Sequence, residues 1–293
     1  MTKDFNLTLK KIKRKYFQRP NYVIRLMSNK GLYPKDPFVN KDALFVKSPN
    51  GFLYTVVRLN KFDNQKYDGE TGWVFPSEIR LLAALSLSYP ADSGQVCFYP
   101  NHMEVNIGKQ IRERDFKNEK FQNKLENLLK LKFSGMELDS LLDFRSFKYR
   151  EDSPEKDDRE RLFEKINVAD KLLIRGLSYL LKAQMLSRNF TFTEEAALLA
   201  FISLNAALDL VRERLVDQGT NNPSYKDAFK YVESVKGFSN NYSEILEMCW
   251  EQRVMLVHPN NKFGILSMGG ILADDFYDTY GELITLYRHL ILK

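Results

Sequence analysis

Long apolar stretches with helical spacing, all in the second half of the chain, constrain the fold more than any other feature of the sequence. From Leu162 to Leu186, apolar residues recur at intervals of three and four, which predicts a helix that buries one side. A second long helix is predicted to begin at the capping-box pattern Thr191-Phe-Thr-Glu194 and to run to about Val216. Because the connection between them is short, these two helices are expected to run antiparallel.

Three more helices are expected after these two. The pattern Ser224-x-x-Asp227 is a start signal for a shorter helix that ends near Gly237. The segments Asn241 to Val257 and Ile271 to Leu292 are expected to form the last two helices. With short connections throughout, the second half predicts an antiparallel helical bundle.

The first half mixes strand and helix signals. The β-branched and aromatic segment Phe52 to Arg58 predicts a strand, and the turn residues Pro49-Asn50-Gly51 before it indicate a hairpin. A second short strand is predicted from Gln95 to Tyr99. Helices are predicted from Ser77 to Leu87, with Ser77 as the cap, and from Phe116 to Leu142.

A charge-rich run from Glu151 to Arg161 is interpreted as the boundary between the two halves, either as a linker or as the solvated first turns of a helix. The chain is therefore expected to be mainly α. Its expected parts are a mixed α/β region at residues 1–150 and a helical bundle at residues 151–293.

Apolar runs and cysteine content exclude several classes of protein. The longest apolar stretch, Ala196 to Val211, is interrupted by polar residues and is interpreted as a buried helix and not as a membrane span. The first residues lack the apolar core of a signal peptide. Cys97 and Cys249 are too few and too far apart for a disulfide framework or a zinc site. We expect a cytoplasmic protein with no membrane partner, no metal and no cofactor.

Charge composition is compatible with a polyanionic partner such as RNA. The formal net charge is +6, although 38 acidic residues are mixed with 44 basic ones. One sharp basic cluster, next to aromatic residues that suit base stacking, is the predicted RNA-binding segment; it consists of Lys10, Lys11, Lys13, Arg14 and Lys15. The alternative interpretation of this cluster is a solvated helix or arm.

The segment Arg253-Val-Met-Leu-Val-His258-Pro259 combines two groups that can cleave RNA without a metal. A guanidinium holds a phosphate by two parallel hydrogen bonds, and an imidazole transfers protons near neutral pH. Pro259 disfavours helical geometry at His258, so the helix is expected to end there and to let His258 turn toward Arg253. The alternative is structural: His258 caps the helix, and Arg253 pairs with an acid such as Glu247 or with a carbonyl.

Asn205 and Asp209 form a second polar signal, because they lie one turn apart in an otherwise apolar helix. Buried polar groups need hydrogen-bond partners, so Asp209 is a candidate to orient Arg253 across the bundle. The alternative is a structural ion pair between Asp209 and Arg212, three residues further on.

Residues from about 160 to 293 resemble a HEPN domain, the helical bundle of many prokaryotic ribonucleases and toxin–antitoxin modules. The resemblance rests on two long helices, the Arg-x4-His element from Arg253 to His258, the following Pro259, and a last helix after a short loop. Val254 departs from the pattern, because nuclease-active members usually carry a polar residue after the arginine. In the family, two subunits face each other and supply two Arg-His pairs to one cleft, which implies a homodimer.

The expected function is therefore a metal-independent endoribonuclease that acts as a homodimer and produces 2′,3′-cyclic phosphate ends. The resemblance implies a role in phage defence or in toxin-like growth control. One alternative is a non-catalytic HEPN-like module that binds RNA or a partner protein, which Val254 favours. Another alternative is a structural subunit of a larger complex, in which the Arg-His pair has no chemical role.

Overall fold

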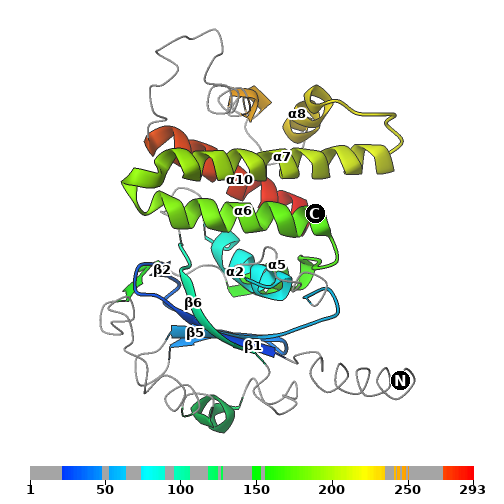
Figure 1. Cartoon of the computed structure of the whole chain (residues 1–293). Coiled ribbons are helices and arrows are strands. Elements are labelled where there is room, and N and C mark those ends of the chain that lie inside the picture. Colours follow the sequence, from blue (N-terminus) through cyan, green and yellow to red (C-terminus); the bar gives the residue numbers. More distant parts are fainter. Residues whose placement is uncertain are drawn as a thin grey trace, which may run out of the picture.

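The computed structural model of the chain describes residues 22–47, 53–63, 74–89, 96–105, 118–124, 127, 147–152, 156–234, 241, 243–244, 246–248, 250 and 273–293. Over these ranges the chain is mainly helical, with a small antiparallel sheet in its N-terminal part (Figure 1). None of the helices in these ranges combines the length and the apolar content needed to cross a bilayer.

The N-terminal sheet has five strands in the order β3-β4-β5-β1-β6, and each neighbouring pair is antiparallel. Its strands are β1 (Tyr22–Met27), β3 (Phe38–Val39), β4 (Ala43–Lys47), β5 (Leu53–Arg58) and β6 (Pro100–Val105). Pairing of Lys47 with Leu53 confirms the strand predicted near residues 52–58 as the second arm of a β4–β5 hairpin. A separate parallel pair joins β2 (Leu32–Tyr33) to β7 (Lys148–Tyr149).

The strand predicted from Gln95 to Tyr99 is wrong in its position. Cys97 forms only an isolated bridge to Leu32, and the sheet strand β6 begins at Pro100. The strand signal comes from apolar residues that are buried in the core, and burial alone does not require a ladder of hydrogen bonds.

Helix α2 (Pro76–Leu87) lies between the sheet and the later helices, and it confirms the helix predicted in this segment. Ser77 does not cap it. The residue before the helix is Phe75, whose backbone N–H donates to the Glu78 carboxylate at 2.9 Å. The Ser77 hydroxyl instead donates to Asp63 at 2.7 Å, and burial raises the pKa of that carboxyl group. Proline is favoured at the first helical position, so the helix begins at Pro76, one residue before the predicted cap Ser77.

A single helix from Leu162 to Leu186 was expected, and this is wrong. The segment is divided between α5 (Lys156–Lys165) and α6 (Lys171–Ser187). Asp170 accepts the backbone N–H of Leu173 at 2.9 Å and caps α6, and Asn167 accepts that of Ala169 at 3.0 Å. Short polar side chains of this kind compete with helical hydrogen bonds and favour a break.

Helix α7 (Thr193–Asp217) matches the second predicted long helix in extent but not in its cap. It follows a 3-10 turn, η4 (Phe190–Phe192), and no side chain caps its first turn. Helix α8 (Tyr225–Ser234) confirms its predicted start, because the Ser224 hydroxyl and Asp227 carboxylate lie 2.7 Å apart across the first turn. The final predicted helix is confirmed as α10 (Ala273–Leu292).

Helices α6, α7 and α10 pack side by side around one tyrosine (Figure 1). The Tyr287 hydroxyl donates to the carbonyl of Ser203 at 2.8 Å, and the Ser203 hydroxyl donates to the carbonyl of Gly176 at 2.9 Å. A Cβ atom on Gly176 would lie 2.0 Å from the Tyr287 hydroxyl, so only glycine allows this close approach. These contacts fix the position of α7, which carries the candidate site.

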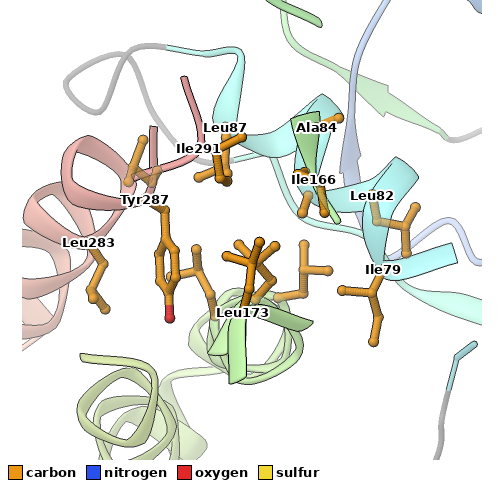
Figure 2. Close-up of a cluster of buried hydrophobic side chains, with 14 of the residues drawn as sticks. Ile79, Leu82, Ala84, Leu87, Ile166, Leu173, Leu283, Tyr287 and Ile291 are labelled. Atoms are coloured by element: carbon orange, nitrogen blue, oxygen red, sulfur yellow. The ribbon is translucent and has the colours of Figure 1, made fainter. Parts of the chain in front are cut away.

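One hydrophobic core extends across residue 150, where the two parts were expected to divide. Helix α5, from the second part, packs against α2, from the first. Figure 2 shows this part of the core, with side chains of α2, α6 and α10 facing one another: Ile79, Leu82, Leu87, Leu173 and Tyr287. Apolar residues of β1, β4 and β5 form a second, smaller cluster, and Phe121 packs against it.

Candidate functional site

The predicted site residues fall into two groups. Asn205 and Asp209 are described, and both lie on α7. Arg253 and His258 lie outside the described residues, as does the predicted RNA-binding cluster Lys10, Lys11, Lys13, Arg14 and Lys15.

Asn205 receives a hydrogen bond from an aromatic residue far along the chain. The Trp250 indole N–H donates to the Asn205 side-chain oxygen at 3.1 Å. The Trp250 ring also packs against Tyr225 at the start of α8, with 5.4 Å between ring centroids. Trp250 is thus held against α7 and α8 by one polar and one aromatic contact.

Asp209, one turn further along α7, is held by two donors. The Arg212 guanidinium approaches its Oδ1 atom at 2.9 Å, and the Tyr225 hydroxyl donates to the same atom at 3.2 Å. Arg212 also donates to the carbonyl of Pro223 at 2.7 Å and lies over the Tyr225 ring, 4.9 Å from its centroid. Burial and the Asp209 charge raise the pKa of Tyr225, so its hydroxyl stays a donor at neutral pH.

The structure therefore contains the Asp209–Arg212 pair that the alternative interpretation of this signal anticipated. The pair does more than neutralise charge, because it connects α7 to the loop before α8 through Pro223. Tyr225 also belongs to this cluster, and no motif in the sequence indicates that it does. The capping pattern at Ser224 predicted the helix that carries it, but a helix start does not tell which face meets Asp209.

A pocket of about 540 Å³ adjoins the cluster on the C-terminal half of α7. Carboxylates dominate its charge: Asp209, Glu213 and Asp217 line it together with Arg212. The pKa of Glu213 is raised by partial burial and by the neighbouring charges of Asp170, Asp209 and Asp217. Repulsion of this kind disfavours a phosphate in the pocket, so Asp209 suits the orientation of a cationic side chain better than contact with RNA.

Within the described ranges, no group of three or more His, Cys, Asp or Glu side chains is arranged to hold a metal ion. Cys97, in the same ranges, is buried, and burial raises the pKa of its thiol far above the usual range. This thiol is therefore not a nucleophile at neutral pH.

The hydrogen bond between Trp250 and Asn205 is expected to couple the two residues energetically. Asn205→Ala and Trp250→Phe each remove it, and Trp250→Phe keeps the aromatic packing on Tyr225. Each variant should lower the free energy of unfolding by about 0.5–1.5 kcal/mol, and the double variant should lose less than the sum. Urea unfolding of the four proteins measures this coupling. Strict additivity would show that the bond does not hold Trp250 on α7.

No protein-family model, no curated protein and no solved structure matches this chain.

Proposed function

We propose that the chain is a metal-independent endoribonuclease of the HEPN type, with Arg253 and His258 as its catalytic residues. The observation that carries the proposal is the contact between Trp250 and Asn205. Trp250 precedes Arg253 by three residues, and side chains three residues apart share one face of a continuous helix. The contact of Trp250 with α7 supports the proposal, because Arg253 follows Trp250 closely in the sequence.

The proposed chemistry needs only side chains. Arg253 binds the scissile phosphate by two hydrogen bonds and offsets the charge that develops in the transition state. His258 accepts the proton of the ribose 2′-hydroxyl, the 2′-oxygen forms a bond to phosphorus, and the bond from phosphorus to the 5′-oxygen breaks. The leaving 5′-oxygen takes a proton from a second acid. The products carry a 2′,3′-cyclic phosphate and a 5′-hydroxyl.

One Arg-His pair supplies one proton-transfer group, but the reaction uses two. A two-fold dimer that brings two pairs to one cleft supplies the second. We therefore expect light scattering at micromolar protein concentration to give the mass of two chains. A monomer under these conditions, with and without RNA, would contradict this part of the proposal.

A non-catalytic module that binds RNA or a protein is the second candidate function. Two observations favour it: the apolar Val254 follows the arginine, and Asp209 already has Arg212 and Tyr225 as partners. Cleavage of RNA by the purified chain in EDTA separates the two candidates, because a binding module leaves the RNA intact.

Arg253→Lys is expected to impair cleavage, although the substitution leaves the net charge unchanged. Lysine keeps the positive charge but loses the planar fork that grips two phosphate oxygens. RNA binding should fall less than cleavage, because other basic residues supply most of the salt-dependent affinity. The matched control is Arg175→Lys, at an exposed position on α6. Equal cleavage by both variants and the parent would exclude Arg253 from the reaction.

A further inference from the structure

A second pocket lies where the sheet region meets the turn between α6 and α7. Its volume is about 530 Å³, within the usual range for a site that binds a small molecule. Figure 1 shows the α6–α7 turn near β2, at the opposite end of α7 from α8. The lining residues come from four separate segments of the chain: Lys30, Tyr99, Lys148, Met185, Leu186, Arg188, Asn189 and Phe192.

The charge of this pocket is opposite to that of the pocket beside Asp209. Lys30, Lys148 and Arg188 line it, and none of the lining residues is acidic. All three cations are exposed, and none of the ion pairs found among the described residues involves them. At the end of α6, the carbonyl of Leu186 accepts the backbone N–H groups of Arg188 and Asn189.

Aromatic and apolar groups form the rest of the pocket. The Phe192 side chain, which lines the pocket, is 41% exposed, so part of its ring is open to a ligand. The Tyr99 hydroxyl donates to the carbonyl of Met185, and burial, followed by the nearby Cys97, raises the Tyr99 pKa to about 12. Tyr99 therefore stays neutral and does not repel an anion.

We propose that this pocket binds a nucleotide, with the phosphates held by Lys30, Lys148 and Arg188 and the base stacked on Phe192. A nucleotide has a flat base that can stack on the exposed phenyl ring. It also has negatively charged phosphates that can pair with the three cations. Lys30 and Lys148 belong to the sheet region, whereas Arg188 and Phe192 belong to the helices. A bound nucleotide thus bridges the two parts of the chain.

This site is separate from the one assigned to cleavage. Phe192 and Asn205 are thirteen residues apart along α7 and the turn before it, a distance of about 20 Å at the rise of an α-helix. The nucleotide inference does not depend on the proposed ribonuclease activity. The nucleotide has two possible sources, a free nucleotide or one unit of an RNA strand, and both present the same base and phosphate chemistry.

Isothermal titration calorimetry of the full chain tests the proposal with three probes. They are ATP, inorganic tripolyphosphate, and a short single-stranded RNA with 2′-O-methyl riboses, which cannot be cleaved through the 2′-oxygen. The test variant is Lys148→Gln/Arg188→Gln. The matched control, Lys171→Gln/Arg175→Gln, removes the same charge from exposed positions on α6. Thermal unfolding verifies that both variants stay folded.

The test variant is expected to bind ATP about tenfold more weakly than the parent, or worse, because it loses two charge-assisted contacts. The control should match the parent. Phe192→Ser should weaken the binding of ATP and leave the binding of tripolyphosphate unchanged, because only ATP has a base to stack. If the parent does not bind ATP, but the test variant binds the RNA more weakly than the control variant does, the nucleotide is part of a strand. If test and control variants bind both ATP and RNA equally, the proposal is wrong.

Discussion

Replacing His258 with alanine is expected to lower RNA cleavage by about 10²–10⁴-fold, the usual loss when a general acid or base is removed. The protein should stay folded, because a histidine at a helix end contributes at most about 1–2 kcal/mol of stability. RNA binding should fall less than cleavage, because basic residues elsewhere in the chain supply most of the salt-dependent affinity. Initial cleavage rates of a defined RNA, measured in EDTA, give the comparison.

His289→Gln is the matched control for this experiment. His289 lies half-buried on α10, and burial, together with Lys293 and Arg214, lowers its pKa to about 4. It is therefore neutral at the pH of the assay, and its replacement should leave cleavage unchanged. If His258→Ala cleaves as fast as the parent, His258 is not catalytic. If it unfolds, His258 is a structural cap.

Glu78→Ala is expected to destabilise the protein by about 3–5 kcal/mol, the cost of leaving one charge of a buried pair without its partner. Glu78 on α2 accepts two hydrogen bonds from Arg25 on β1, at 2.6 and 2.8 Å. The Arg25 and Glu78 side chains are only 7% and 2% exposed. The same carboxylate accepts the Phe75 N–H at the start of α2. Its loss therefore weakens both the sheet–helix contact and the helix cap.

The double variant Arg25→Leu/Glu78→Leu separates these effects. Removal of both charges leaves no buried ion, so most of the stability should return even though the hydrogen bonds are gone. Urea unfolding gives the free energies. A double variant that is as unstable as Glu78→Ala would show that the geometry of the pair, and not the stranded charge, determines the loss.

Apolar spacing located α7 and α10, and the start pattern Ser224-x-x-Asp227 located α8. The same spacing failed between α5 and α6. Ile166 and Leu173 are both buried, so the apolar pattern continues across a break that Asn167 and Asp170 create. Periodicity reports burial, and a bent chain can bury the same residues as a straight helix.

The sequence revealed one side of the candidate cluster and not the other. Asn205 and Asp209 are polar residues in an otherwise apolar helix, and this contrast can be recognised without knowledge of the fold. Their partners Tyr225 and Trp250 are 16 and 45 residues away along the chain. Aromatic residues are ordinarily core residues, so nothing in the sequence distinguishes these two before the helices are packed.

The nucleotide pocket left no signal in the sequence at all. Lys30 and Lys148 are isolated lysines in separate segments, and only the parallel pairing of β2 with β7 brings their surroundings together. Arg188 and Phe192 join them because α6 ends beside this pair of strands. Positive charge gathered by folding cannot be found by a search for runs of basic residues.

We propose that this chain cleaves RNA without a metal, through the ribose 2′-hydroxyl. The most direct test is mass spectrometry of the fragments that the purified protein releases from a defined RNA in EDTA. We expect 2′,3′-cyclic phosphate and 5′-hydroxyl ends, with no product from the same RNA carrying 2′-O-methyl riboses. Intact RNA, or cleavage that stops in EDTA and returns with magnesium, would contradict the claim.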